Sequence, residues 1–244
     1  MKAGKKWTAA LPILAGAMWG SAGVFVRKLY AFGMDSYTIL ATKMCVGAVI
    51  LFLILLCWKP KLLRVRWQDL WIFLGSGILG MLGLNYCYNE AIRTVSMSLA
   101  AVLLGLSPIF VMLLSAVLFR EKITVRKLGC MALALVGCLL VSGVLEGSGL
   151  QWSWGGIGMG VLSAFFYALY AIFSKTASNR GYDTFTIIFY SILAISLVLL
   201  PLTDWGSFGA FLAEAPVGNT VFTLAHAAFT TILPYALYTL SQLY

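Results

Sequence analysis

Residues 97–119 read MSLAAVLLGLSPIFVMLLSAVLF, a run of apolar and small side chains without a single charge. A helix that crosses a bilayer needs about 20 such residues, because the hydrocarbon core is about 30 Å thick. Lipid offers no partner for an unpaired backbone amide, so a single segment of this kind must be helical. The stretch therefore predicts an all-α integral membrane protein.

The rest of the chain has the same character. Of its 244 residues, 61% are hydrophobic and 10% are charged, and the mean hydropathy is +0.95. A water-soluble protein of this length has no core large enough for so much apolar surface, whereas a chain in lipid needs none. Comparable runs predict eight transmembrane helices without an inserted soluble domain. The predicted spans are residues 7–27, 37–58, 68–91, 97–119, 127–145, 154–174, 184–202 and 217–244.

The basic residues are distributed unevenly between the two sets of alternate connections. Thirteen Lys and Arg residues fall in the set that includes the N-terminus, and three fall in the other set. Cytoplasmic connections are enriched in Lys and Arg, so this bias places the N-terminus in the cytoplasm. The excess of basic residues behind the net charge of +9 is therefore explained by the orientation of the chain in the lipid bilayer, and no nucleic-acid partner is expected. We expect the bilayer to be the plasma membrane.

No group of residues is spaced for catalysis or for metal binding. The chain has one histidine, His226, and eight acidic residues, most of which lie at helix ends or in connections. General acid–base chemistry needs such groups within hydrogen-bond reach of each other. Five cysteines occur in apolar segments without a CxxC pair, which predicts neither a disulfide framework nor a metal site. We expect no enzyme activity, no cofactor and no metal.

A weak internal repeat relates the two halves of the chain. The motif WGSAGVFVRK at residues 19–28 aligns with YALYAIFSKT at residues 167–176, which lies 148 positions later. The motif LNYCYNEA at residues 84–91 aligns with LPYALYTL at residues 233–240, which lies 149 positions later. Two matches at nearly the same offset, on helices of equal rank, predict a duplicated unit of five helices.

A repeat with an odd number of helices enters the membrane from opposite sides in its two copies. Such inverted repeats are typical of secondary transporters, which bind their solute near the midplane between the halves. We assign residues 1–147 to the first five-helix repeat and residues 148–244 to a second repeat with three transmembrane helices. Equivalents of the fourth and fifth helices are missing from this second repeat, so we expect it to be truncated.

Four sequence motifs, taken together, resemble those of a known family of membrane proteins. They are WGS at 19–21, SMSLAAVLLGLSPIFVMLLSAVLFREKIT at 96–124 with its central Pro108, RKLGCMALALVGCLLV at 126–141 and TTILPYALYTL at 230–240. Together they resemble the EamA-type branch of the drug/metabolite transporter superfamily, whose carriers have ten helices. The resemblance extends from the first span to the last residue. It implies alternating access around a central cavity that is lined by helices 1, 3, 4, 6, 8 and 9.

Polar and aromatic side chains deep in the predicted spans are the candidates for solute binding, because burying them in lipid without a partner is costly. An aromatic, nearly uncharged set favours a small neutral or zwitterionic solute, such as an amino acid, or a drug-like cation over a phosphorylated sugar. Each tyrosine could equally pack with its hydroxyl on a neighbouring carbonyl. The candidate residues are Trp19, Asn85, Tyr86, Asn89, Ser107, Tyr167, Tyr170, His226 and Tyr235.

Four kinds of residue have a structural interpretation, and two of them, the histidine and the prolines, also have a functional one. His226, near mid-depth of its span, either couples transport to protons or forms a neutral hydrogen bond between helices. Lys43 is expected to extend along its helix to water. Pro108 and Pro234 free carbonyls that either contact a solute or allow the helix to bend. Glycine pairs four residues apart, such as Gly16 and Gly20, are expected to let helices approach closely.

The sequence thus predicts a membrane transporter of small organic metabolites. One alternative is a truncated carrier that does not transport, or a membrane assembly subunit. Another is a membrane enzyme acting on lipids, which would need acidic or histidine residues clustered at one interface, and none are found. A homodimer is left open, because no residue argues for it.

Overall fold

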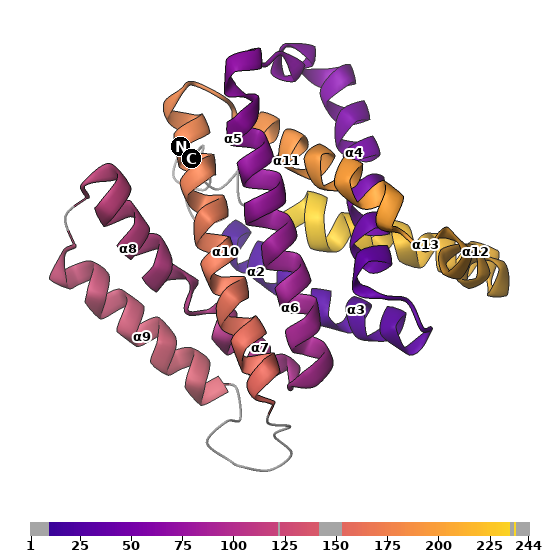
Figure 1. Cartoon of the computed structure of the whole chain (residues 1–244), viewed down its shortest axis with the longest axis horizontal. Helices are drawn as coiled ribbons and strands as arrows, with labels where there is room; N and C mark the ends of the chain where they lie inside the picture. The colour runs from indigo at the N-terminus through magenta and orange to yellow at the C-terminus, as the bar shows by residue number, and fades with distance from the viewer. Residues whose placement is uncertain (1–9, 122, 142–152, 235–236, 238–244) are drawn as a thin grey trace. The chain divides into compact units, whose positions relative to one another are not determined.

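The computed structural model describes residues 10–121, 123–141, 153–234 and 237, and the regular elements in these ranges are all helical (Figure 1). The chain divides into two compact units. Unit 1 comprises Met1–Arg64 and Thr184–Tyr244, and unit 2 comprises Val65–Asp183. Each unit is described by itself below.

Five of the predicted spans coincide with helical segments that are long and apolar enough to cross a membrane. Four of the segments agree with the predicted ranges to within a few residues, and Trp154–Asn179 extends five residues beyond the predicted span of 154–174. The segments are Ser36–Trp58, Trp67–Thr94, Met97–Phe119, Trp154–Asn179 and Thr184–Leu202. Hydropathy alone therefore located these helices, as expected for segments whose backbone must satisfy its own hydrogen bonds in lipid.

The other three predicted spans are described only in part. The first contains α2 (Ala10–Gly20) and α3 (Ala22–Ala31), which are separated at Ser21. The Ser21 hydroxyl donates a hydrogen bond of 2.7 Å to the Met18 carbonyl, which places a side chain in the backbone ladder at the break. The fifth span contains α9 (Val125–Val141), and the eighth begins with α13 (Pro216–Ala227).

A short helix, α12 (Trp205–Glu214), lies where the sequence predicted only a connection. Asp204 caps its N-terminus, because the carboxylate accepts hydrogen bonds from the amides of Gly206 at 3.0 Å and Ser207 at 3.2 Å. The chain then enters α13 directly at Pro216, a residue suited to a first helical turn.

The fourth span is interrupted, as Pro108 predicted. Helix α7 (Met97–Leu104) ends before Gly105, and α8 (Ser107–Phe119) begins one residue before the proline. A proline has no amide to donate to the preceding turn, so the α-helix restarts with Pro108 in its first turn.

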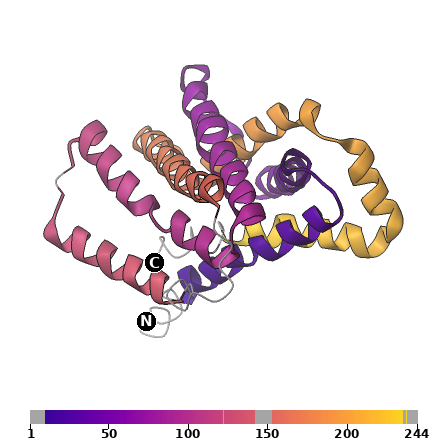
Figure 2. The ribbon, with the colours of Figure 1, turned by 60° about the horizontal axis from the view of Figure 1, so that its bottom comes forward.

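Unit 2 is built around α10 (Trp154–Asn179), which packs along α5 (Leu70–Leu74), η3 (Gly75–Leu82) and α6 (Gly83–Thr94). Figures 1 and 2 both show α10 beside α6. The contact is close because glycines face α10 at three successive turns. A Cβ on Gly80 would lie 2.7 Å from the Tyr170 Cα, and one on Gly83 would lie 2.7 Å from the Phe166 ring.

Of the glycine pairs spaced four residues apart, only some allow neighbouring helices to approach closely. A Cβ on Gly160 would lie 2.5 Å from the Leu103 side chain, and one on Gly156 would overlap Thr94. The packing interpretation is therefore supported for this pair. Around Gly16 and Gly20 no described atom lies within 4 Å of an added Cβ, so the interpretation is not supported there.

Unit 1 is built around α4 (Ser36–Trp58), which packs against α11 (Thr184–Leu199) and α13. At one end of α4, the Thr186 hydroxyl donates to the Leu62 carbonyl at 2.8 Å, and the Tyr190 hydroxyl donates to the Leu63 carbonyl at 2.7 Å. At the other end, a buried apolar cluster joins α3, α4 and α12. Its members are Val26, Leu29, Met34, Ile39 and Phe211.

Helix α3 ends in a left-handed turn. Gly33 has a φ of 82°, a conformation that costs a residue with a side chain. The Gly33 amide donates to the Tyr30 carbonyl at 2.9 Å, and the Met34 amide donates to the Leu29 carbonyl at 3.3 Å. This pair of hydrogen bonds is a Schellman-type helix end.

Helix α10 ends in the same way, 148 residues later. Gly181 has a φ of 86°, its amide donates to the Ser178 carbonyl at 2.9 Å, and the Tyr182 amide donates to the Ala177 carbonyl at 3.2 Å. The helices that follow these turns, α4 and α11, also begin 148 positions apart. The offset found in the sequence is thus repeated in the backbone, at residues that the sequence alignment did not use.

A second correspondence lies in the third and eighth spans. Both contain a π-helical segment, η3 in the third span and η6 (Ala228–Ile232) in the eighth. At the sequence offset of 149, η6 falls on residues 79–83 and so overlaps the end of η3. Wide turns of this kind are rare and are frequent at functional sites. Pro234 follows η6 and cannot donate an amide to that turn.

Candidate functional site

The third span carries the first group of candidate residues, on α6 directly after the π-helical segment. The Asn85 side-chain amide donates a hydrogen bond of 2.8 Å to the Met81 carbonyl, at the end of η3. Tyr86 is half-buried. Asn89, one turn further along the same face as Asn85, is only 2% exposed. Within the described part of the chain, the Asn89 Nδ2 atom has no hydrogen-bond partner.

A buried amide without a hydrogen bond is costly, since it has lost water and gained nothing. Such a group calls for an explanation beyond packing. Asn89 lies in unit 2 on a helix that packs against α10, so a polar ligand in that unit is one source of the missing bond. Among the candidates of unit 2, Asn89 is therefore the one that the geometry favours most.

The remaining candidates of unit 2 lie on α8 and α10. Ser107 is buried at the start of α8, where the helix restarts after its break. The rings of Tyr167 and Tyr170 are 6.4 Å apart on α10, and Tyr167 is 37% exposed. The Tyr170 backbone lies against Gly80 of η3. The structure thus brings the helices of six candidates together within one unit.

The candidates of unit 1 lie on the first and eighth spans. Trp19 is half-buried on α2, and His226 is 1% exposed on α13. The Phe25 ring stacks on the imidazole, with ring centroids 5.1 Å apart and an angle of 10° between the planes. In the described residues, the His226 Nε2 atom has no hydrogen-bond partner. Tyr235 lies outside the described residues.

Lys43 differs from its prediction. Its side chain is 5% exposed on α4, so the interpretation that it extends to water is wrong. The reason is the packing of α4 against α11 and α13, which covers that face of the helix.

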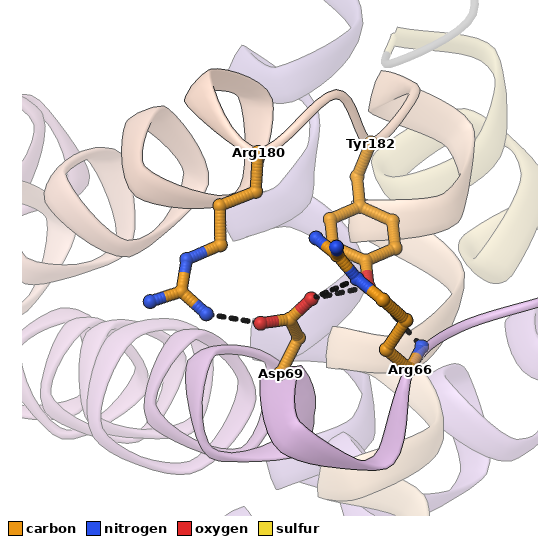
Figure 3. A network of polar contacts seen from close by, with 4 residues as sticks. All are labelled: Arg66, Asp69, Arg180 and Tyr182. Carbon is orange, nitrogen blue, oxygen red and sulfur yellow. Dashed lines mark hydrogen bonds and ion pairs between the residues drawn. The ribbon is translucent and has the colours of Figure 1, made fainter.

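A polar network that the sequence analysis did not identify lies at one end of unit 2 (Figure 3). The Asp69 carboxylate is 2% exposed and accepts a hydrogen bond of 2.6 Å from the Tyr182 hydroxyl. The Arg66 guanidinium donates to the same oxygen at 2.9 Å, and Arg180 forms an ion pair with the other oxygen. The network joins the start of the third span to the end of α10.

A second ion-pair group holds the same end of α10. Glu121, in the connection between α8 and α9, pairs with Lys175 of α10 and, at 3.3 Å, with Lys127 of α9. The Lys175 ammonium, with a smaller contribution from Lys127, lowers the pKa of the Glu121 carboxyl below its ordinary value of 4.5. These charges therefore link three helices of unit 2 at one end.

This pKa shift predicts a pH dependence. A carboxyl whose pKa is lower in the folded than in the unfolded protein stabilises the fold above the unfolded value, and this contribution is lost as the pH falls through the folded value. Glu121→Gln is therefore expected to lower the melting temperature at pH 7, and the difference from the unsubstituted protein should shrink as the pH falls below 4.5. A thermal-shift series across pH checks this. Glu214→Gln, at an exposed position, is the control, and an unchanged difference at low pH would contradict the prediction.

The described residues contain no group of His, Cys, Asp and Glu that could hold a metal ion. Four of the five cysteines are described, and all four are free thiols: Cys45, Cys57, Cys87 and Cys130. Glu90 pairs with Arg93 at 3.4 Å near the end of α6. Asp69 was missed because two of its three partners, Arg180 and Tyr182, lie more than 110 positions away in the sequence.

Comparison with known proteins agrees with this architecture. Residues 6–143 and 154–244 match the model of the EamA-like transporter family. An uncharacterized transporter of Archaeoglobus fulgidus is 27% identical over 232 residues, which cover 95% of this chain and 76% of the relative. The pseudopaline exporter CntI of Pseudomonas aeruginosa is 27% identical over 198 residues, which cover 81% of this chain and 66% of the exporter.

A solved crystal structure shares the fold. It superposes with a TM-score of 0.58 at 17% sequence identity, and the alignment covers 98% of this chain and 86% of the other. The two parts of the family match, 6–143 and 154–244, separate where the sequence analysis divided the repeats.

Proposed function

The chain belongs to the EamA-like transporter family, and we propose that it carries a small organic solute across a cell membrane by alternating access. The members of this family are transporters and not enzymes. The chain is an integral membrane protein with several apolar helices. We further propose the chemical class of this solute, an inverted repeat of five-helix units, and the residues that bind the solute.

The observation that carries the proposal is the repeated helix end at Gly33 and Gly181. Identical left-handed turns, 148 residues apart, support a duplication of residues 1–147 in residues 148–244. Since five helices separate the copies, the second copy runs in the opposite direction through the membrane. Inverted repeats allow one half to move against the other around a fixed site, which is the basis of alternating access.

The ion pairs of unit 2 support the proposed orientation. The ion pairs of Asp69 and Glu121 hold three basic segments at one end of unit 2. These segments carry most of the basic residues of the chain, and they lie in or beside residues 59–66, 120–127 and 175–180. Connections that meet at one end of a unit lie on one side of the membrane. The excess of Lys and Arg then assigns that side, and the N-terminus, to the cytoplasm.

The proposed solute is amphipathic and neutral or zwitterionic, with an amino acid as the simplest example. The candidate residues supply aromatic faces, hydroxyls and amides, which suit such a molecule. The relative from Pseudomonas aeruginosa exports pseudopaline, as its name states, so export of an organic metabolite occurs among similar proteins.

Asn89 provides a test that separates binding from folding. Asn89→Leu removes a buried Nδ2 group that has no hydrogen-bond partner among the described residues, so the melting temperature should stay the same or rise. If the amide binds solute, transport should fall by about tenfold, the value of one lost hydrogen bond in a dry site. Counterflow of labelled L-phenylalanine and L-leucine into proteoliposomes measures the transport rate.

Cys87→Ala is the matched control. Cys87 is buried on the same helix, but on the face opposite Asn89, and its loss should leave counterflow unchanged. No counterflow of any tested amino acid by the unsubstituted protein would contradict the proposed solute class. Equal rates for Asn89→Leu and the unsubstituted protein would remove Asn89 from the site.

A further inference from the structure

We infer that Arg66 and Arg180, in unit 2, form a binding site for the phosphate group of an anionic phospholipid. The site lies at the end of unit 2 that the proposed orientation places at the cytoplasmic surface. It is separate from the residues proposed to bind the solute, so it goes beyond the transport function. Figure 3 shows the two guanidinium groups on either side of Asp69.

The first argument is the way in which the two arginines are held. Arg66 donates through Nε to one oxygen of Asp69 at 2.9 Å, and Arg180 donates through Nη1 to the other oxygen. The central carbon of the Arg66 guanidinium also lies 5.9 Å from the centre of the Tyr182 ring. That of Arg180 lies 5.7 Å from the centre of the Trp71 ring. One carboxylate and two rings therefore fix both groups at one place, so a ligand has less to order when it binds.

The second argument is the hydrogen-bonding capacity that remains. A guanidinium group has five N–H donors. Within the described ranges, the terminal nitrogens of Arg66 and the Nε and Nη2 atoms of Arg180 have no hydrogen-bond partner. The Arg66 side chain is 66% exposed and that of Arg180 is 41% exposed, so these donors are accessible from outside. Asp69 is 2% exposed and its oxygens already accept three hydrogen bonds, so it positions the arginines and is itself covered.

The third argument is the excess of positive charge at this end of unit 2. Glu121 is shared by Lys127 and Lys175, just as Asp69 is shared by two arginines, so neither acid neutralises its partners fully. The described residues there include six basic and three acidic side chains, a net charge of +3. An anionic lipid surface attracts such a group of cations. The basic residues are Arg66, Arg120, Arg126, Lys127, Lys175 and Arg180, and the acidic residues are Asp69, Glu121 and Asp183.

The fourth argument is the pair of exposed tryptophans beside the arginines. Trp67 follows Arg66 directly and is 87% exposed, and Trp71 is 52% exposed. Trp67 begins the segment Trp67–Thr94, which is long and apolar enough to cross a membrane. Tryptophan is enriched at both membrane–water interfaces, where its ring is at the level of the headgroups. The arginines therefore lie at headgroup depth, which favours a lipid phosphate over a free phosphate ion.

The chemistry of the donors favours an anionic lipid over a zwitterionic one. The planar guanidinium group matches the geometry of phosphate oxygens, and it is more weakly hydrated than an ammonium group. A phosphatidylcholine headgroup adds a cation, which the net positive charge repels, whereas a phosphatidylglycerol headgroup adds none. A bound phosphate joins Arg66, at the start of the third span, to Arg180, at the end of α10, and so stabilises unit 2.

Melting temperatures of the purified full chain in a neutral detergent test the inference. The protein is titrated at constant ionic strength with dioctanoylphosphatidylglycerol, with dioctanoylphosphatidylcholine and with inorganic phosphate. Phosphatidylglycerol should raise the melting temperature, because a ligand that binds only the folded state stabilises it. Phosphatidylcholine and inorganic phosphate should have little effect.

Substitution of either arginine should weaken the binding of phosphatidylglycerol. Arg66→Gln and Arg180→Gln should each lower the apparent affinity by about tenfold, as expected for a lost hydrogen bond between charged groups. The affinity is taken from the lipid concentration that gives half of the maximal shift, so a lower starting melting temperature does not affect it. Arg66→Lys keeps the charge without the planar fork and should recover only part of the affinity.

Arg126→Gln is the matched control. Arg126 is an exposed arginine at the same end of unit 2, and its removal lowers the net charge by the same amount as Arg66→Gln. The affinity should therefore change far less than in Arg66→Gln. The inference is overturned if phosphatidylglycerol has no effect, or if phosphatidylcholine or inorganic phosphate acts equally. It is also overturned if Arg126→Gln weakens binding as much as Arg66→Gln, which would show a diffuse effect of charge and no site.

The outcomes also separate this inference from the proposed function. Binding of phosphatidylglycerol that depends on Arg66, without counterflow in proteoliposomes, would support the lipid site and contradict transport. Counterflow by a protein that phosphatidylglycerol does not stabilise would support transport and remove the lipid site.

Discussion

Gly80→Ala is expected to destabilise the protein by about 2 to 3 kcal/mol, the upper part of the range found when a methyl group is forced into a packed interior. The added Cβ would lie 2.7 Å from the Tyr170 Cα and 3.0 Å from the Tyr170 amide nitrogen. Backbone atoms cannot rotate away, so η3 and α10 must separate, and unit 2 loses part of the packing around α10. Thermal unfolding in detergent, monitored by far-UV circular dichroism, measures the loss.

Gly158→Ala is the matched control for this prediction. Gly158 lies on α10 itself, and an added Cβ there has no described atom within 4 Å. An exposed Gly-to-Ala change within a helix stabilises by up to about 1 kcal/mol through helix propensity. The two substitutions should therefore change the melting temperature in opposite directions. Equal effects would show that η3 and α10 are not in close contact.

Asp69→Asn is expected to lower the melting temperature by roughly 5 °C, because the amide leaves two guanidinium groups without their shared carboxylate. Asp69 is nearly inaccessible to solvent and has three hydrogen-bonding partners. A double-mutant cycle with Arg180→Gln isolates the ion pair. Arg180→Gln should lower the melting temperature in the unsubstituted protein and have little effect in the Asp69→Asn variant.

Glu90→Gln is the control for the Asp69 substitution. Glu90 also pairs with an arginine, but Arg93 is 63% exposed and the two residues lie on one helix, three positions apart. Exposed pairs of this kind contribute little. If Arg180→Gln costs the same with and without Asp69, the network in Figure 3 does not hold the end of α10.

The spans of this protein were predictable because hydropathy and helix length are local properties. The break before Pro108 was also predictable, since a proline acts on its own turn. The matched turns at Gly33 and Gly181 were not predicted, although both glycines are visible in the sequence. A glycine in an apolar chain is usually a packing residue, and only the backbone angle shows that these two end helices.

The candidate site was predictable in kind but not in detail. Asn89 and His226 were chosen as polar residues in apolar spans, and burial without hydrogen bonds now sets them apart from the other candidates. The π-helical segments could not be read from the sequence, because the width of a turn depends on the neighbouring helices. The prediction that the Lys43 side chain extends to water was wrong for the same reason. The position of Lys43 along its span does not show which neighbouring helices cover it.

Labelling of two single cysteines tests the inverted repeat most directly. Ala31 and Asn179 are the exposed last residues of α3 and α10, and they are equivalent at the offset of 148. Ala31→Cys and Asn179→Cys are introduced separately into a protein whose native cysteines are replaced, and intact cells are treated with a membrane-impermeant maleimide. An inverted repeat with a cytoplasmic N-terminus predicts that only the cysteine at position 31 reacts before the membrane is permeabilised. Reaction of both cysteines, or of neither, would contradict the inverted repeat.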